Sequence, residues 1–488
     1  MRALDLVIVL SYLAGVVATG AFFARRQKTT RQYFLGGRQI PWWAVSASIV
    51  ATETSTITFI SVPGIMFARE GDFAFLQLVF GYLLGRVAIS ILLIPSYFRG
   101  ELLTVYELLK TRFGGAVKAL AALLFVVMRT VADGVRLLLT ALVLAAVYKA
   151  FSGAQTLDAV VVGSVLVIGN VMILFTFFGG MEAVIWIEVA QLGIYIAGAL
   201  AAAAVLLQMI PGGWDAAAAL GETHGKFRLF HFDFDLTRPF TFWAGLIGGC
   251  FLTMSTHGTD QYLVQRYLCT DSPRKATAAL LSSGIVVLLQ FAGFLVIGLL
   301  LFAFYRPFEA GAVALAGDRV FPDFITRHLP TGISGLVVAA IFAAAMSSSL
   351  NSIAATAVSD LYRPAVANQT DRHYLGVSRW LTVVAGAAQI GVALAIRDSP
   401  RSALDTALSI ASLLNGPVLG VFLLGAFSRR AGTPAALAGM CAGLAAVLAV
   451  RFFTPVAWPW YTLVGSGTTL LVGSLGGLAS GRGEERVA

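Results

Sequence analysis

The chain has 488 residues, of which 58% are hydrophobic and only 12% are charged, and its mean hydropathy is +0.84. Soluble domains carry about 25% charged residues, so this composition excludes a soluble protein and indicates a polytopic helical membrane protein. The net charge of +9 does not indicate nucleic-acid binding, because Lys and Arg cluster in short loops between apolar runs. The three cysteines, Cys250, Cys269 and Cys441, are far apart and lack the spacing of a metal site.

Apolar runs of about 18 or more residues mark membrane spans. We expect thirteen, at about 3–24, 41–68, 73–98, 117–149, 157–178, 182–210, 240–265, 276–304, 332–361, 376–397, 402–427, 431–453 and 460–480. The first run has the length of a signal peptide, but its basic cluster follows it and only Arg2 precedes it, the reverse of a signal peptide's charge order. We therefore expect this helix to be retained, with the N-terminus outside.

The distribution of charge over the loops predicts the orientation. Lys and Arg are more numerous in the loops on the side of residues 25–40, and in the C-terminal tail, than in the opposite loops. Basic loops remain on the cytoplasmic side. We expect a multi-pass protein of the cell (plasma or inner) membrane with a cytoplasmic C-terminus.

A polar interruption of the second expected span is the most informative segment of the chain. Residues 51–58 read Ala-Thr-Glu-Thr-Ser-Thr-Ile-Thr. Hydroxyls can bond a carbonyl four residues back, so by themselves they also fit a packing face between helices. An unpaired carboxylate at mid-bilayer, however, costs roughly 3 kcal/mol or more. Glu53 is therefore expected to bind a cation, a proton or an arginine.

Two later spans carry comparable polar segments. Residues 343–352 read Ala-Ala-Ala-Met-Ser-Ser-Ser-Leu-Asn-Ser, and residues 257–262 read His-Gly-Thr-Asp-Gln-Tyr. The first segment fits either a tight interface of small residues or a set of oxygen ligands for a small cation. The second would interrupt a helix at Gly258, five spans after the interruption at Glu53. Paired interruptions of this kind are typical of transporters with inverted repeats, in which the binding site lies between the breaks.

Charged residues also occur within two other spans. Arg129, Asp133 and Arg136 are spaced to share one helical face. They either neutralise each other or leave one guanidinium to hold a substrate carboxylate or to pair with Glu53. Glu188 lies near the cytoplasmic end of its span and is either an interfacial or a functional carboxylate.

Motifs of the common enzymes are missing. The sequence has no Walker motif, no His-Glu-x-x-His, no Gly-x-Ser-x-Gly and no Cys-x-x-Cys. We therefore expect neither an enzyme nor an ATP-driven pump, and no organic cofactor.

Several motifs of the chain resemble those of the sodium:solute symporter family, which includes sodium–glucose, sodium–proline and bacterial sialic-acid transporters. The resemblance rests on residues 33–38 (Tyr-Phe-Leu-Gly-Gly-Arg), 179–186, 259–268, 343–348 and 415–420. It implies a LeuT-like fold with alternating access. The two five-helix inverted repeats would occupy 41–210 and 240–427, with one leading and two trailing helices.

The resemblance also implies a sodium site. Its ligands would be backbone carbonyls and two hydroxyls, namely those of Ala51, Thr54, Ala344, Ser347 and Ser348. Glu188 falls where many members carry an aspartate near the sodium route, which implies a role in a second site. The chain has fewer residues between Ser348 and Asn351 than most members, so Ser349 remains an alternative to Ser348.

The substrate contacts that the resemblance implies lie around the two breaks. In the sialic-acid type, positions matching Ser55, Thr58, Phe73 and Gln77 lie near the substrate, and an arginine, here Arg129 or Arg136, holds its carboxylate. We add Glu53, Asp260 and Gln261 to this substrate set.

We therefore predict Na⁺-coupled symport of a small organic solute across the bilayer by a protein that functions as a monomer. A carboxylate-bearing solute of the sialic acid or monocarboxylate type is favoured. The alternatives are a sugar or amino acid as solute, H⁺ coupling through Glu53 or Glu188, and a solute sensor that does not transport.

Overall fold

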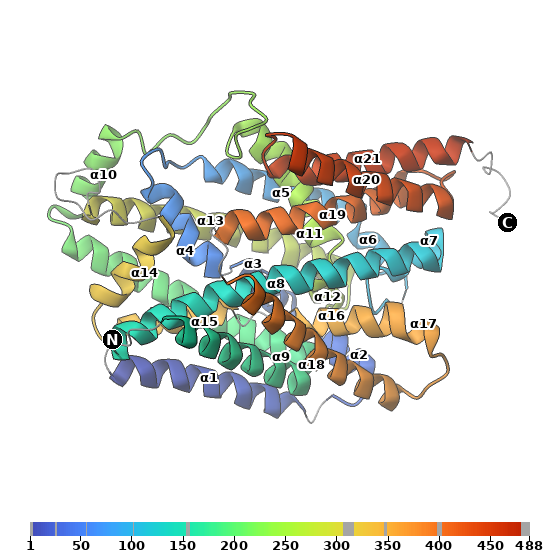
Figure 1. Cartoon of the computed structure of the whole chain (residues 1–488), viewed down its shortest axis with the longest axis horizontal. Helices are drawn as coiled ribbons and strands as arrows, with labels where there is room; N and C mark the ends of the chain where they lie inside the picture. Colours follow the sequence, from blue (N-terminus) through green and yellow to red (C-terminus); the bar gives the residue numbers. More distant parts are fainter. Residues whose placement is uncertain are drawn as a thin grey trace.

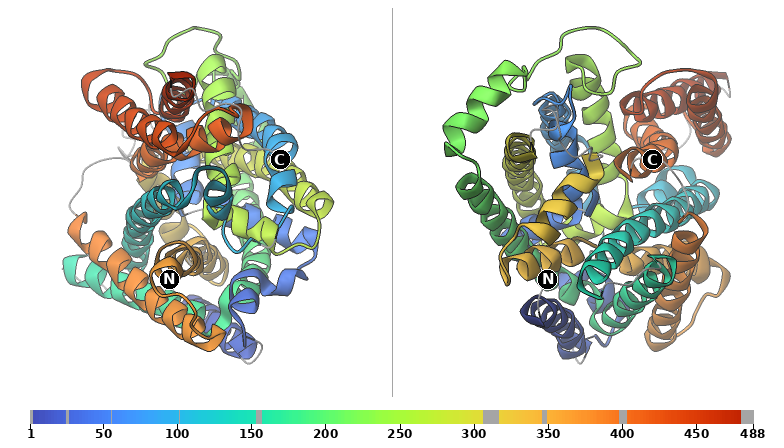
Figure 2. Two further views of the ribbon diagram at one scale, coloured as in Figure 1. Left: turned by 90° about the vertical axis from the view of Figure 1, so that its right-hand side faces the viewer. Right: turned by 60° about the vertical axis from the view of Figure 1, so that its left-hand side comes forward.

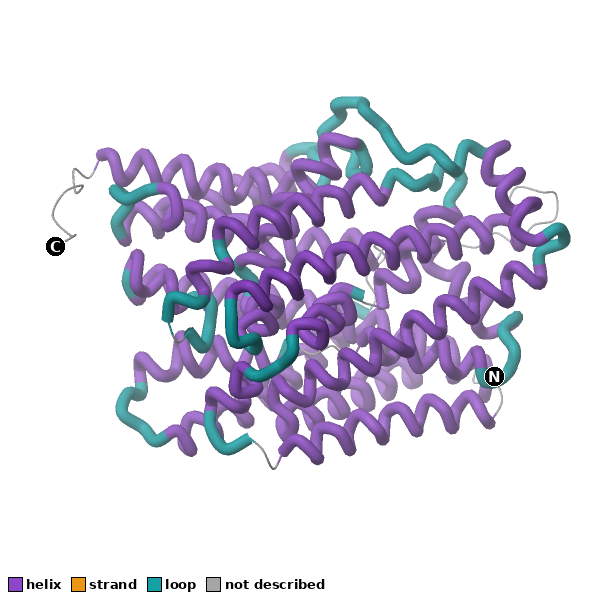
Figure 3. Tube along the Cα trace, turned by 180° about the vertical axis from the view of Figure 1, so that it is seen from behind, coloured by secondary structure: helices purple, strands orange, loops and turns teal. Residues whose placement is uncertain are grey.

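The computed structural model describes residues 3–24, 27–54, 56–100, 102–152, 157–305, 317–345, 349–397 and 403–479. Within these ranges the regular structure is entirely helical, as the composition predicts. Most of the long helices follow the long axis of the molecule, with α10 and α14 at one end and α7 and α17 at the other (Figure 1). Figure 3 shows the extended connection between α10 and η2 crossing one end of the bundle.

The helices of the first half of the chain are α1 (Ala3–Ala24), α2 (Thr30–Leu35), η1 (Gly36–Arg38), α3 (Trp42–Glu53), α4 (Thr56–Phe67), α5 (Phe75–Leu92), α6 (Ile94–Tyr97), α7 (Glu107–Phe113), α8 (Gly115–Ser152), α9 (Leu157–Met209) and α10 (Gly213–Thr223). Those of the second half are η2 (Ala244–Gly248), α11 (Gly249–Gly258), α12 (Gln261–Leu268), α13 (Pro273–Tyr305), α14 (Gly317–Arg327), α15 (Ile333–Ala345), α16 (Leu350–Thr356), η3 (Ala357–Tyr362), α17 (Arg363–Ala365), α18 (Asp371–Ala395), α19 (Ala403–Phe427), α20 (Thr433–Phe453) and α21 (Pro459–Ala479).

Seven helices in the described part of the chain are long and apolar enough to cross a membrane by themselves: Phe75–Leu92, Gly115–Leu142, Asp158–Met209, Pro273–Tyr305, Asp371–Ala395, Thr433–Phe453 and Pro459–Ala479. An eighth crossing is a bent pair, Trp42–Glu53 with Thr58–Phe67, whose axes differ by 58°. Other expected spans are divided into shorter helices, such as η2 with α11 and α12. One of the seven helices, Asp158–Met209, holds two expected spans, and Val7–Phe23 and Leu413–Phe427 are shorter apolar helices.

The helix α9 contains two of the expected spans, 157–178 and 182–210, joined by a turn at Gly180. Its φ and ψ angles are 60° and −166°, which a side chain would strain. A Cβ atom there would also lie 2.8 Å from the carbonyl oxygen of Tyr33. Glycine thus lets α2 pack directly against the turn of α9.

Two spans are broken where the sequence predicts interruptions. The helix α3 ends at Glu53, and its C-cap Thr54 has non-helical angles of −74° and 84°. The helix α11 ends at Gly258, and α12 begins after Asp260, whose carboxylate accepts a hydrogen bond of 2.9 Å from the backbone N–H of Tyr262. This N-cap stabilises the start of α12.

The remaining helices surround these breaks. The leading helix α1 lies along one edge of the molecule and the trailing pair α20 and α21 along the opposite edge (Figures 1 and 2). Near the breaks, α5 and η2 approach so closely that a Cβ atom on Gly81 would meet the carbonyl oxygen of Gly245 at 2.1 Å. Such close approach between helices requires small residues, and it joins α5 firmly to η2.

Candidate functional site

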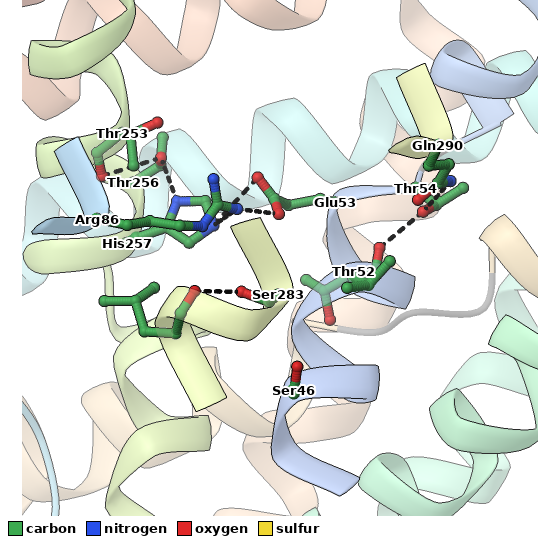
Figure 4. Close-up of polar contacts among 12 residues, drawn as sticks. Ser46, Thr52, Glu53, Thr54, Arg86, Thr253, Thr256, His257, Ser283 and Gln290 are labelled. Carbon is green, nitrogen blue, oxygen red and sulfur yellow. Dashed lines mark hydrogen bonds and ion pairs between the residues drawn. The ribbon is translucent and has the colours of Figure 1, made fainter. Parts of the chain in front are cut away.

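The end of α3 carries two residues of the expected sodium site, Ala51 and Thr54. Both are buried. The hydroxyl of Thr54 donates to the carbonyl of Val50 at 2.7 Å and accepts a hydrogen bond of 2.6 Å from the amide of Gln290 on α13 (Figure 4). Because this hydroxyl is already used inside the protein, the backbone carbonyl is the polar group of Thr54 that remains for a ligand.

Glu53 has an arginine partner, but it is Arg86 of α5 and not Arg129 or Arg136. Glu53 and Arg86 form an ion pair, and Oε1 of Glu53 lies 3.2 Å from Nε2 of His257 on α11 (Figure 4). The side chain of Glu53 is 14% exposed, and that of Arg86 is fully buried. Of the alternatives left open for Glu53, an arginine partner is thus found, but not the arginine of α8 that was one possibility. The available signal was Arg86 itself, a lone cation within an apolar run.

Thr58, in the first turns of α4, is buried, and its hydroxyl donates to the carbonyl of Glu53 at 3.3 Å. This bond crosses the break and connects the two half-helices. Ser55, the other hydroxyl expected near the solute, lies outside the described residues.

The charged face of α8 is formed as the spacing predicts. Asp133 lies 3.8 Å from Nη1 of Arg129 and 3.7 Å from Nη1 of Arg136. Arg129 also forms an ion pair with Asp260, and its guanidinium lies 4.5 Å from the ring centroid of Tyr262. Two predicted site residues from distant parts of the chain, Arg129 and Asp260, thus contact each other.

Arg136 is the less engaged of the two arginines. Its Nη1 lies 3.4 Å from the hydroxyl of Tyr262, and its side chain is 17% exposed against 8% for Arg129. Its contacts with Asp133 and Tyr262 are both long for hydrogen bonds.

Gln261 is fully buried beside Asp260 and bonds only backbone groups in its described contacts. Its Oε1 accepts from the N–H of Val105 at 2.8 Å, and its Nε2 donates to the carbonyl of Leu103 at 3.1 Å. These bonds hold the segment 102–106, which precedes α7, against the start of α12.

Glu188, expected near the sodium route, lies in the second half of α9 and is almost fully buried. Nη2 of Arg266 on α12 donates to its Oε1 at 2.5 Å, and Oγ1 of Thr52 donates to the same oxygen at 3.1 Å. Ser48 donates to its other oxygen. Arg266 was not among the predicted site residues, and the only sequence signal for it was its place directly after a broken span.

The second half of the expected sodium site lies between α15 and α16. Ala344 lies in the last turn of α15, while Ser347 and Ser348 lie outside the described residues. Ser349, the alternative ligand, is the N-cap residue of α16 and accepts a hydrogen bond of 3.3 Å from the amide of Gln389.

Phe73 lies in the turn before α5 and Gln77 in its first turn, and both contact the connection between α10 and η2. The ring of Phe73 stacks on Phe227, with 6.0 Å between centroids. Gln77 donates to the carbonyl of Phe240 at 3.2 Å and accepts from the N–H of His231 at 3.0 Å. These contacts tie the expected solute residues of α5 to that connection.

Two broken helices that contact each other inside an all-helical membrane protein, with buried charges at both breaks, define a secondary active transporter of the LeuT-like fold. The chain belongs to the sodium:solute symporter family, whose model matches residues 33–443. It is therefore a transporter rather than an enzyme, with Na⁺ as the coupling ion.

Relatives and solved structures agree with this assignment. The chain is 32% identical to the sodium/sialic acid symporter NanT of Aliivibrio fischeri over 492 residues, covering 97% of this chain and 92% of that protein. It is 30% identical to the human sodium/iodide cotransporter over 428 residues, covering 86% and 64%. A Na⁺-coupled sialic acid symporter in a substrate-bound outward-open state has a TM-score of 0.88 at 28% identity, covering 98% of both chains. Mhp1, a nucleobase-cation-symport-1 transporter, shares the fold with a TM-score of 0.57 at 15% identity, covering 91% of this chain and 93% of that one.

Proposed function

We propose that the chain carries a carboxylate-bearing solute, of the sialic acid or monocarboxylate type, together with Na⁺. The similarity to NanT over 97% of the chain supports this class. So does the 29% identity to the human sodium-coupled monocarboxylate transporter 1, which covers 90% of this chain and 72% of that protein. Movement of one Na⁺ across 100 mV supplies about 2.3 kcal/mol for uphill transport.

The observation that carries the proposal is the position of Arg136 on the charged face of α8. Arg129 is occupied by Asp260, whereas Arg136 makes only long contacts and is partly exposed. A guanidinium can bind a carboxylate bidentately. Arg136 is therefore the favoured residue for the solute carboxylate, and Arg129 supports it through their shared partner Asp133.

The remaining substrate residues of the proposal fall into two groups. Ser55, Thr58, Phe73 and Gln77 would line the solute path along α4 and α5. Glu53, Asp260 and Gln261 lie at the two breaks. The backbone hydrogen bonds of Gln261 favour a role in holding α12 rather than direct contact with solute.

The proposed sodium ligands are the carbonyls of Ala51, Thr54 and Ala344 and the hydroxyls of Ser347 and Ser348. The engaged hydroxyl of Thr54 supports a backbone role for that residue. Hard oxygen atoms are the ligands that small cations prefer. Glu188 would serve in a second sodium site or act on the first from a distance.

The transport cycle follows from these assignments. Na⁺ would bind at the break of α3 and favour an outward-open state, and the solute would then bind beside it. Coupling is a difference in ligand affinity between the two states of the protein. The inverted repeats would be residues 41–210 and 240–427, in a monomer of the cell membrane with its N-terminus outside and its C-terminus in the cytoplasm.

Uptake into proteoliposomes tests the proposal. Sialic acid, pyruvate, glucose and proline would each be offered with an inward Na⁺ gradient, with K⁺ in its place, and with a pH gradient alone. Na⁺-driven uptake of a carboxylate solute, lost in Arg136→Gln, is expected. Uptake of glucose alone contradicts a carboxylate-bearing solute. Uptake of proline alone, which is an amino acid with a carboxylate, contradicts the sialic acid or monocarboxylate type. Uptake that persists without Na⁺ but needs the pH gradient contradicts Na⁺ coupling and favours H⁺ coupling through Glu53 or Glu188.

The sodium ligands are tested separately by thermal unfolding of the purified protein in Na⁺ against K⁺. Ser347→Ala combined with Ser348→Ala is expected to abolish the stabilisation by Na⁺. Ser349→Ala is the matched control, because it removes a neighbouring hydroxyl. Loss of the Na⁺ effect in the control alone would move the ligand to Ser349.

A further inference from the structure

The carboxylate of Glu53 lies beside two side chains from two other helices. It forms an ion pair with Arg86 of α5 and lies 3.2 Å from Nε2 of His257 on α11 (Figure 4). Nη2 of Arg86 lies 3.3 Å from the same His257 nitrogen. We call Glu53, Arg86 and His257 the Glu53 clamp.

The hydrogen bonds of Thr256 indicate the tautomer of neutral His257. The hydroxyl of Thr256 donates to the carbonyl of Leu252 at 3.0 Å, so its oxygen is left to accept from Nδ1 of His257, at 3.0 Å. The proton of neutral His257 therefore lies on Nδ1. Its bare Nε2 accepts from Arg86, because a guanidinium can only donate. Only a protonated His257 could instead donate to Glu53.

Within the Glu53 clamp, the negative charge of Glu53 balances the positive charge of Arg86. Arg86 is fully buried, and its Nε and Nη1 atoms have no hydrogen-bond partner among the described residues. Asp260, the next carboxylate along the chain from His257, is paired with Arg129. Two other elements that contact α11, η2 and α21, carry no charged residue. Glu53 is thus the partner that neutralises Arg86.

The same short segment is also held from a third helix. Gln290 of α13 donates to the hydroxyl of Thr54 at 2.6 Å, one residue after Glu53 (Figure 4). The end of α3 is therefore tied to α5, α11 and α13 through side chains of two consecutive residues. The carbonyls of Ala51 and Thr54 belong to this tied segment.

We propose that Arg86 is a positioning residue for the sodium site: by holding Glu53 it orients the carbonyls of Ala51 and Thr54 toward the ion. His257 acts through Arg86, whose hydrogen bond its Nε2 accepts. This inference rests on the proposed function. Neither Arg86 nor His257 contacts Na⁺ in this arrangement.

The experiment is a double-mutant cycle on the purified full-length protein, read as apparent Na⁺ affinity from Na⁺-dependent thermal stabilisation and from ²²Na⁺ binding. Glu53→Gln and Arg86→Gln each leave one buried charge unpaired, and each is expected to weaken Na⁺ binding by about tenfold or more. The double variant removes both charges and is expected to recover to within about threefold of the unmodified protein.

Two further variants complete the design. Lys118→Gln breaks another buried pair, with Asp360 at 3.1 Å, and should leave Na⁺ affinity unchanged even if it lowers stability. Arg86→Lys keeps the charge and is expected to bind Na⁺ within about threefold, and it replaces Arg86→Gln if that variant does not fold. If the unmodified protein does not bind Na⁺, the proposed function fails. If it binds Na⁺ and the single variants bind equally well, or the double variant is no better than they are, only the positioning role is overturned.

Discussion

Arg266 of α12 and Glu188 of α9 form an ion pair in which both side chains are 1% exposed, with 2.5 Å between Nη2 and Oε1. The pair joins the half-helix after one break to α9, and Thr52 of α3 donates to the same carboxylate at 3.1 Å. Through Glu188, three elements of the site region are thus held together.

Breaking this pair is predicted to destabilise the protein strongly. Glu188→Gln or Arg266→Gln leaves a buried charge without its partner, which costs about 3–5 kcal/mol. The free energy of unfolding in detergent is the measurement. Lys275→Gln is the control, because its pair with Asp271 is half exposed at 2.6 Å and should contribute less than about 1 kcal/mol. An equal loss in the free energy of unfolding on breaking the buried pair and the exposed pair would contradict the prediction.

Gln265 is predicted to keep α12 closed against its neighbours. Its amide donates to the carbonyl of Phe34 at 2.7 Å and to Asn351 at 2.8 Å, and its oxygen accepts from Ser352 at 2.6 Å. Gln265→Ala leaves these buried partners unsatisfied, at about 1–3 kcal/mol for each group. Opening of α12 should then expose Cys269, which is fully buried.

Maleimide labelling of Cys269 measures this opening, in a background with Cys250→Ser and Cys441→Ser. The rate at which maleimide labels Cys269 should rise in Gln265→Ala. Gln32→Ala, a change at an exposed amide of α2, should leave it unaltered. An unchanged rate in Gln265→Ala would show that α12 is held by its other contacts.

Lys226, in the connection between α10 and η2, is predicted to make the free energy of unfolding depend on pH in the alkaline range. Burial lowers its pKa to about 8 from 10.5, and its Nζ donates to the carbonyls of Met66 at 2.8 Å and Ala68 at 2.5 Å. Between about pH 8 and 10.5 the unfolded chain therefore binds more protons at this lysine than the folded protein does. Its contribution to the free energy of unfolding should rise with pH across this window.

The comparison with Lys226→Met isolates that contribution, because all other titrating groups are shared. Thermal midpoints would be measured from pH 7.5 to 10. As the pH increases, the thermal midpoint of the unmodified protein should rise relative to that of Lys226→Met. Parallel curves would mean that Lys226 stays charged in the folded protein.

Asp5 of α1 is predicted to stabilise the start of α15. The carboxylate is fully buried, and its Oδ1 accepts from the N–H groups of Gly332 at 2.7 Å and Gly335 at 2.9 Å and from the hydroxyl of Ser334 at 2.9 Å. Asp5→Ala should cost about 1–2 kcal/mol, the usual value of a helix cap.

Thermal unfolding checks this cap. Asp5→Asn keeps an acceptor and should lose less than Asp5→Ala. Asp215→Ala changes an exposed aspartate in the first turn of α10 and should stay within about 0.5 kcal/mol. A loss in Asp5→Ala no greater than in Asp215→Ala would contradict a capping role.

Local patterns predicted the two helix breaks and the charged face of α8 correctly. The polar residues at 51–58 and 257–262 marked both helix breaks, since hydroxyls, glycine and charges compete with the backbone ladder of a helix. The spacing of Arg129, Asp133 and Arg136 placed them on one face of α8, because helical neighbours follow from sequence distance alone.

The partners across helices could not be predicted in the same way. Glu53 was expected to seek an arginine, but the choice of Arg86 depends on how α5 and α11 pack beside the end of α3. Arg129 and Asp260 were both expected at the site, yet their ion pair joins residues far apart in the chain. Gln290, which holds Thr54, carried no signal because a single amide in an apolar run has many structural uses.

Composition and hydropathy thus determined that this chain is a helical membrane protein with polar breaks, since the bilayer accepts few other arrangements of such residues. Tertiary structure alone decided which buried charges meet. In a medium that cannot solvate an ion, each charge must take the partner that packing brings within reach. For Glu53 that partner is Arg86, on a neighbouring helix whose position the sequence of α3 does not encode.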